Sequence, residues 1–189
     1  MTGRPRDPAV DDAIRQAALD LITEQGYRAV SMEGIAARSG VSKQAVYRRY
    51  AGKGEVILDV LAAYARARLP TPDTGDLRED LLTLLENTFA AQRGAPGALN
   101  QALAAEALQA PAFARRVNTE LIVARRDAVR QILSRARDRG QVAHPDDEVL
   151  IDLVFGPMWY ALLFDTGKLT DAYAAALTDA VVAVAAHAP

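Results

Sequence analysis

Apolar side chains recur every three or four residues along almost the whole chain, and no stretch of five or more residues alternates cleanly between apolar and polar side chains. The first pattern is typical of amphipathic helices, whereas alternation is typical of half-buried strands. We therefore predict an all-α fold. About nine helices are expected, over residues 8–25, 31–39, 43–50, 53–68, 77–93, 98–109, 111–139, 147–164 and 170–186.

Residues with strong capping preferences mark the start of several of these helices. Asp7 precedes Pro8, which suits an N-cap followed by the first helical residue. Asp76 and Glu79 have the spacing of a capping box at the start of another helix. The Pro- and Gly-rich segment 70–75 between these helices predicts a change of architecture there.

Two short helices are predicted to meet at a three-residue turn, Gly40-Val41-Ser42. Ser31 and Ser42 are expected to cap the two helices, and Gly40 suits the left-handed residue that ends the first one. Apolar Val41 is expected between the helices, and Val46 faces the core. This arrangement is typical of a helix-turn-helix, whose second helix enters the major groove of DNA.

Charge is distributed unevenly along the chain. The net charge is −2, but residues 38–53 contain five Lys or Arg residues and no Asp or Glu. A basic run taken alone is usually a solvated helix face. Because this run coincides with the predicted turn and second helix, phosphate binding is the favoured interpretation.

The segment from Gly26 to Tyr50 resembles the DNA-binding domain of the TetR family of bacterial regulators. The resemblance spans about residues 8–60 and includes the Gly-Tyr stop, the Ile-Ala pair, the Gly-Val-Ser turn and the lysine that opens the fourth helix. It implies a three-helix helix-turn-helix DNA-binding domain over residues 1–52. A helical effector-binding and dimerisation domain is expected over residues 53–189.

The expected DNA contacts combine this resemblance with side-chain chemistry. Ser42, Lys43 and Gln44 open the recognition helix, where lysine can reach guanine acceptors and glutamine can pair with adenine. Phosphate or minor-groove contacts are expected from Arg4, Arg6, Ser31, Tyr47, Arg48, Arg49 and Lys53. Three residues depart from the family pattern, namely Arg49, Tyr50 and Gly52, and Arg49 is expected to add a phosphate contact.

The last two predicted helices differ in kind from the others. Residues 147–164 are apolar nearly all round, and residues 170–186 are rich in alanine and valine. Such helices need neighbours on every side, and a partner subunit is the simplest source. We therefore predict a homodimer formed through residues 147–187. Gly156-Pro157 is expected to kink the first of these helices.

A pocket for a small-molecule effector is expected in the C-terminal domain. Ligand pockets are mainly apolar and aromatic, which makes candidates of Phe89, Phe113, Asp152, Phe155 and Trp159. Core or dimer packing is the alternative role for each aromatic side chain. Asp152 lies inside an apolar run and must be paired, neutral or solvated.

Other classes of protein receive little support. The chain has no cysteine and only two histidines, and it lacks HExxH, GxSxG and P-loop motifs. No enzymatic activity, metal or cofactor is expected. The longest apolar run is shorter than the roughly 20 residues of a membrane helix, and the first residues lack a secretory signal. We predict a cytoplasmic protein without a membrane partner.

The predicted function is a transcriptional repressor that a small molecule releases from a palindromic operator. The alternatives are a ligand-dependent activator and a DNA-binding dimer without an effector. In the favoured hypothesis, dimerisation sets two recognition helices about 34–36 Å apart, to match successive major grooves. The ligand then changes this separation.

Overall fold

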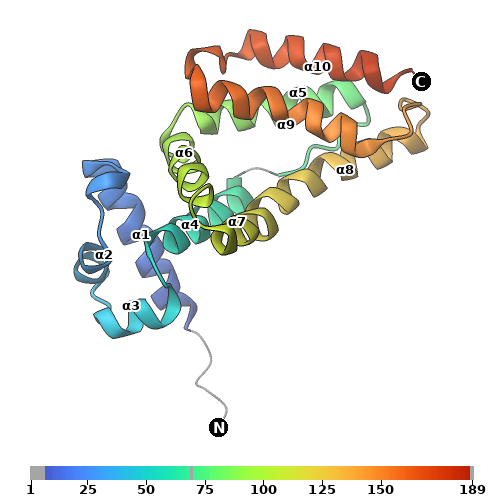
Figure 1. Ribbon diagram of the computed structural model, residues 1–189. Helices are drawn as coiled ribbons and strands as arrows, with labels where there is room; N and C mark the ends of the chain where they lie inside the picture. The colour runs from blue at the N-terminus through green and yellow to red at the C-terminus, as the bar shows by residue number, and fades with distance from the viewer. Residues whose placement is uncertain (1–6, 69, 188–189) are drawn as a thin grey trace.

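The computed structural model of the chain describes residues 7–68 and 70–187. All regular secondary structure in these residues is helical, which confirms the all-α prediction. Figure 1 shows two groups of helices. No helix in the described ranges has the length and apolar character required to cross a membrane.

The first group consists of four helices. They are α1 (Pro8–Gln25), α2 (Met32–Ser39), α3 (Lys43–Arg49) and α4 (Lys53–Arg68). A 3-10 turn, η1 (Tyr27–Ala29), joins α1 to α2. The predicted caps of this part are confirmed, because the side chains of Asp7, Ser31 and Ser42 accept hydrogen bonds from backbone N–H groups of the helices that follow them.

The second group begins after the Pro- and Gly-rich segment. It contains α5 (Leu77–Gln92), α6 (Ala95–Ala107), α7 (Pro111–Val117), α8 (Val123–Asp138), α9 (Asp147–Phe164) and α10 (Asp171–Ala185). A π-helical turn, η2 (Asn118–Ile122), joins α7 and α8 into one continuous run, and a 3-10 turn, η3 (Thr166–Lys168), precedes α10. Asp76 Oδ1 accepts from Glu79 N at 2.9 Å, as the capping-box spacing predicts.

Two helices differ from the sequence-based prediction. Helix α6 begins at Ala95 rather than near residue 98, because Pro96 is compatible with the first turn of a helix. The predicted helix over residues 111–139 contains the π-helical turn η2, which the apolar periodicity did not indicate. Helix α9 continues as one α-helix through Pro157, and the kink expected at Gly156-Pro157 stays a prediction.

The hydrophobic core is divided into two clusters. One cluster joins α1–α4 to Leu99 and Leu103 of α6 and to Val117 and Leu121. The other joins α5, α8, α9 and α10. Helices α4 and α6 lie where the two groups meet and contact each other (Figure 1). Helix α4 therefore packs with the predicted DNA-binding helices even though it lies beyond residue 52.

Candidate DNA interface and ligand cavity

The turn between α2 and α3 has the predicted helix-turn-helix geometry. Gly40 has φ 69° and ψ 9°, a left-handed conformation that is costly for residues with a Cβ. Ser42 Oγ accepts from Ala45 N at 3.3 Å, which fixes the start of α3. Val46 is completely buried, and partly buried Val41 packs against the same cluster. Helix α3 is thus held rigidly by its inner face.

The outer face of α3 is open to solvent. Lys43, Gln44 and Arg48 are exposed, and Tyr47 retains 48 % of its surface. The hydroxyl of Tyr47 donates to Glu33 Oε1 at 3.0 Å, and this hydrogen bond raises the pKa of Tyr47. The candidates for base and phosphate contacts on this face therefore share one accessible surface. The hydrogen bond from Tyr47 to Glu33 of α2 fixes the orientation of the tyrosine side chain.

Two of the predicted phosphate contacts are engaged inside the protein instead. Arg49 Nε lies 2.8 Å from Asp11 Oδ1 of α1, and its Nη1 donates to Ala45 O at 3.2 Å. Lys53 Nζ donates to the carbonyls of Tyr27 and Val30 at 3.2 and 3.3 Å, and it lies 4.3 Å above the Tyr27 ring. Both cations bind groups that come from other helices or turns, which the local sequence pattern did not reveal.

The remaining predicted DNA contacts have different positions. Ser31 is exposed and caps α2 by accepting from Gly34 N at 3.1 Å. Ser42 is exposed at the start of α3. Arg4 and Arg6 lie outside the described residues.

The other departures from the family pattern also have structural roles. The Tyr50 hydroxyl donates to Asp59 Oδ2 at 2.6 Å, and Arg15 Nη1 donates to the same oxygen at 2.8 Å. This pair of hydrogen bonds joins α1, α4 and the end of α3. Near Gly52, which offers no side-chain cap, Glu55 Oε2 accepts from the backbone N–H of Ala51 at 2.8 Å.

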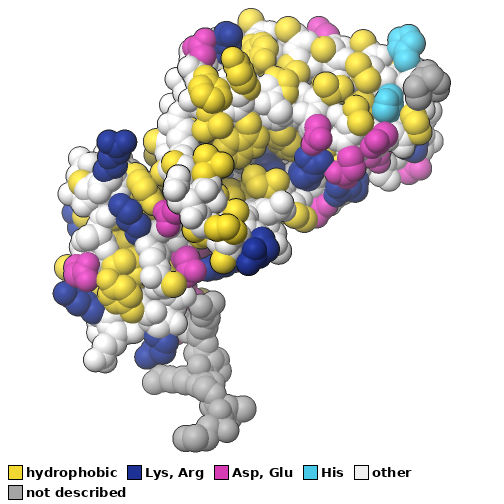
Figure 2. All heavy atoms as spheres, viewed as in Figure 1, with side chains coloured by type: hydrophobic (Ala, Val, Ile, Leu, Met, Phe, Trp, Pro, Cys, Tyr) yellow, Lys and Arg dark blue, Asp and Glu magenta, His cyan; other side chains and the backbone are white. Residues whose placement is uncertain are grey.

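A cavity of about 420 Å³ lies between the two groups of helices. Its walls come from α4, α5, α6, η2, α8 and α9. Hydrophobic side chains surround the hollow visible in Figure 2, beside a cluster of acidic and basic side chains. The volume falls within the range of about 300–1,000 Å³ typical of small-molecule sites.

The structure places only three of the five candidate ligand-binding residues in the cavity wall. Phe155, Trp159 and Asp152 line the cavity. Phe89 does not, because it is completely buried in the C-terminal core, with its ring centroid 6.0 Å from that of Tyr173. Phe113 packs against the N-terminal cluster and is also absent from the cavity wall. Phe89 and Phe113 therefore have the alternative role that was considered for each aromatic residue, which is core packing.

Asp152 lies at the edge of the cavity and is paired. Its side chain is 70 % exposed, and Oδ1 accepts from Arg126 Nη1 at 2.5 Å. Arg126 also donates to Glu148 Oε2 at 2.5 Å. The acidic residue within the apolar run therefore faces solvent, where an arginine of α8 neutralises it.

Sequence reasoning missed Arg125 as a cavity residue. Arg125 lines the cavity although the sequence pattern did not single it out, and burial lowers its pKa. Its Nη2 donates to Thr88 Oγ1 at 3.0 Å. The residue lies three positions after η2, and π-helical turns are frequently found at functional sites. The apolar periodicity of this helix gave no signal of that turn.

Models of two families match this chain. The one described as "Bacterial regulatory proteins, tetR family" matches residues 14–60, and the one described as "Tetracyclin repressor-like, C-terminal domain" matches residues 71–181. Together they include the helix-turn-helix and most of the helices around the cavity.

Individual proteins are similar over almost their full lengths. The uncharacterized HTH-type transcriptional regulator YdeS of Bacillus subtilis is 34% identical over 172 residues, which are 90% of this chain and 87% of YdeS. The DNA-binding transcriptional repressor TetR of Mycobacteroides abscessus is 30% identical over 173 residues, or 91% of each chain. The crystal structure of the TetR family transcription regulator SCO0332 superposes with a TM-score of 0.82 at 28% identity, covering 93% of this chain and 97% of that one.

Proposed function

This chain belongs to the TetR family of transcriptional regulators, and from that premise we propose that it is a repressor that a small molecule releases from its operator. The observation that carries the proposal is the cavity of about 420 Å³ between the two groups of helices. Helix α4 contributes Leu61 and Tyr64 to its wall and also packs against α1. A molecule bound there touches an element on which the DNA-binding helices rest.

The proposed DNA surface is the exposed face of α3 with the start of α2. Lys43 and Gln44 read base edges, while Ser31, Ser42, Tyr47 and Arg48 bind phosphates. We leave Arg49 and Lys53 out of this surface, because both bind partners within the domain.

We propose that the homodimer forms through residues 147–187, mainly through one face of α9. Large apolar side chains that are 36–75 % exposed lie along one stripe of this helix, at Val149, Leu153, Tyr160, Leu163 and Phe164. Exposed apolar stripes of this kind mark interaction sites. A twofold axis through this face would present two α3 helices to one palindromic operator.

The proposed coupling runs through α4 and α6. Helix α6 lines the cavity with Pro96 and Asn100, and Glu106 near its other end accepts a hydrogen bond from Tyr27, beside the first helix of the DNA-binding domain. A ligand that shifts α6 or α4 changes the separation of the recognition helices. Such coupling typically amounts to about 1–3 kcal/mol.

Operator binding and release test this function directly. Fluorescence anisotropy would measure binding of the dimer to labelled DNA from the region upstream of its own gene, at two salt concentrations. Lys43→Ala should abolish the preference for this DNA over a scrambled sequence. Lys168→Ala, the same change in η3 of the C-terminal group, is the matched control and should leave the preference intact.

A library of small molecules would then be screened for compounds that quench the fluorescence of Trp159, the single tryptophan of the sequence. Compounds that bind should lower operator affinity. Compounds that bind and raise it would identify an activator, and binding with no change in operator affinity would contradict effector control.

A further inference from the structure

The wall of the cavity is apolar except at a few positions. Leu61, Leu121, Ile122, Phe155, Met158 and Trp159 supply its hydrophobic surface. Asn100 and Gln92 form a polar patch, with Asn100 Nδ2 donating to Gln92 Oε1 at 3.1 Å. An apolar site with a few convergent polar groups favours a ligand with a hydrophobic body and one polar end.

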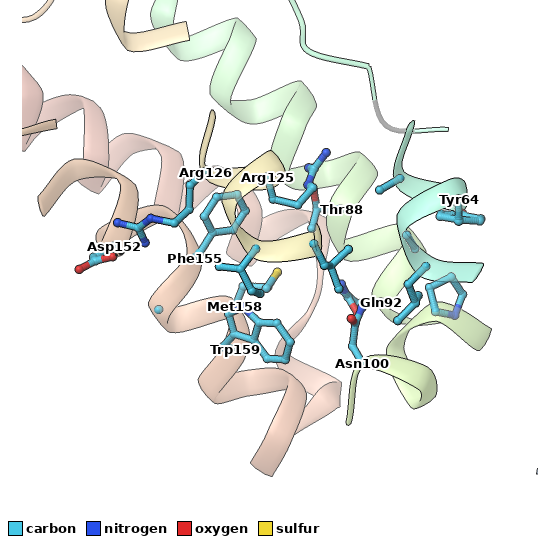
Figure 3. A pocket seen from close by; sticks show the side chains of 17 residues that line it. Tyr64, Thr88, Gln92, Asn100, Arg125, Arg126, Asp152, Phe155, Met158 and Trp159 are labelled. Atoms are coloured by element: carbon cyan, nitrogen blue, oxygen red, sulfur yellow. Dashed lines mark hydrogen bonds and ion pairs between the residues drawn. The ribbon is translucent and has the colours of Figure 1, made fainter. Parts of the chain in front are cut away.

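Two consecutive arginines at this site have different surroundings. Figure 3 shows Arg126 directed toward Asp152, whereas Arg125 extends toward Thr88. The charge of Arg126 is balanced by Asp152 and Glu148 at the solvent edge. Arg125 lies partly buried in the cavity wall, and the hydroxyl of Thr88 is one of its partners. That hydroxyl in turn donates to Leu84 O at 2.6 Å, so its oxygen is oriented to accept from Arg125.

A partly buried guanidinium on the wall of an apolar cavity favours an anionic ligand. Removing a cation from water is costly, and an anion that enters the same site offsets part of that cost. A carboxylate can accept two parallel N–H bonds from arginine, and such charge-assisted bonds are roughly twice as strong as neutral ones. The burial that lowers the pKa of Arg125 would also strengthen its attraction to an anion.

We propose that the cavity binds a small amphipathic acid, whose carboxylate pairs with Arg125 and whose apolar body lies against Phe155 and Trp159. The inference rests on the proposed function in one respect, namely that this cavity is the effector site. It names the chemical class of the effector as a monoanion of about the size of an aromatic or medium-chain carboxylic acid.

Matched pairs of acids and primary amides separate charge from shape. The probes are phenylacetate, 1-naphthylacetate and decanoate, each beside its own amide, and isothermal titration calorimetry of the full-length protein measures each affinity. We expect at least one acid to bind on the order of tenfold more tightly than its amide, as expected for hydrogen bonds to a charged group. In Arg125→Gln the acid and its amide should bind equally.

Two further variants test whether the preference for an acid over its amide depends on the guanidinium group of Arg125. Arg125→Lys keeps the charge but removes the planar pair of donors, so it should retain part of the preference. Arg130→Gln removes a cation of the same helix that pairs with Asp127 and Glu148 outside the cavity, and it should keep the full preference. Melting temperatures identify any variant that fails to fold, and Arg125→Met then replaces Arg125→Gln.

Some outcomes would overturn the proposal. It fails if the wild type prefers none of the three acids to its amide, or if the preference survives in Arg125→Gln. Operator binding separates this failure from that of the proposed function. Neutral compounds that release the operator would leave the repressor function intact. Acids that bind through Arg125 without affecting the operator would support the site but contradict its regulatory role.

Discussion

The Tyr27 hydroxyl donates a hydrogen bond to Glu106 Oε2 at 2.5 Å, between residues that are 79 positions apart in the sequence. Tyr27 follows α1, while Glu106 lies in the last turn of α6, the helix that carries Asn100 at the cavity. Burial, together with this hydrogen bond, raises the pKa of Tyr27, so the phenol remains protonated as the donor at neutral pH. Lys53 lies above the ring of the same tyrosine. One hydrogen bond therefore joins the cavity helix to the DNA-binding domain.

Tyr27→Phe should weaken both stability and coupling. The loss of a hydrogen bond to a carboxylate should lower the free energy of unfolding by about 1.5–3 kcal/mol, as measured by urea denaturation. The ratio of operator affinities without and with an effector should also move toward one. Tyr173→Phe is the control, because its hydroxyl forms no hydrogen bond among the described residues. An unchanged ratio in Tyr27→Phe would exclude this route of coupling.

Gly54→Ala should disturb the same contact from the other side. A Cβ at this position would lie 2.6 Å from Glu106 Cδ, so the carboxylate must move away. If its displacement breaks the bond to Tyr27, the effects of Gly54→Ala and Tyr27→Phe on the coupling ratio should be less than additive. A double mutant that shows the full sum of both effects would mean that the two residues act separately.

Arg48 and Arg49 should give opposite results when each is replaced by methionine. Arg49→Met removes the ion pair with Asp11, so the free energy of unfolding should fall by about 2 kcal/mol. Arg48→Met should leave stability unchanged but weaken operator binding, and its salt slope should fall by about 1 for each phosphate that the variant no longer binds. Urea denaturation and anisotropy at several salt concentrations measure the two quantities. Equal loss of stability in both variants would contradict the different positions of the two side chains.

A charge on the exposed face of α9 should prevent dimerisation. Tyr160→Glu places a carboxylate within the apolar stripe, and burying it without a partner would cost several kcal/mol. Sedimentation velocity should therefore show monomers. Leu108→Glu is the matched control, because Leu108 is 85 % exposed at the end of α6, away from this face. A dimer that persists in Tyr160→Glu would place the interface elsewhere.

The ion pairs between α8 and α9 should make stability depend on pH. Hydrogen bonds from Arg130 and then Arg126 lower the pKa of Glu148 from its ordinary value of 4.5. A carboxyl with a lowered pKa stabilises the folded state above its ordinary pKa, and this contribution is lost as pH falls through the lowered value. Glu148→Gln should therefore melt at a lower temperature than the wild type at pH 7, and the difference should shrink below pH 4.5. A difference in melting temperature that stays constant from pH 7 to pH 3 would contradict this role of Glu148.

The sequence by itself determined the features that depend on neighbouring residues. Apolar periodicity, the caps at Asp7, Ser31 and Ser42, and the left-handed Gly40 are decided by hydrogen bonds and sterics within a few positions. These local rules were sufficient to predict an all-α chain and a helix-turn-helix with an exposed α3. The resemblance to the TetR family rested on the same residues.

Only the tertiary structure decided the role of side chains whose partners are distant in sequence. Arg48 and Arg49 look alike in the sequence, but the contact of α3 with α1 places only Arg49 beside Asp11. Phe89 and Phe155 were equal candidates, and helix packing buried both in the C-terminal core but brought only Phe155 to the cavity. Arg125 joined that cavity after a π-helical turn that the periodicity did not indicate. Such choices depend on which helices meet and at what angle, and these are properties of the whole fold.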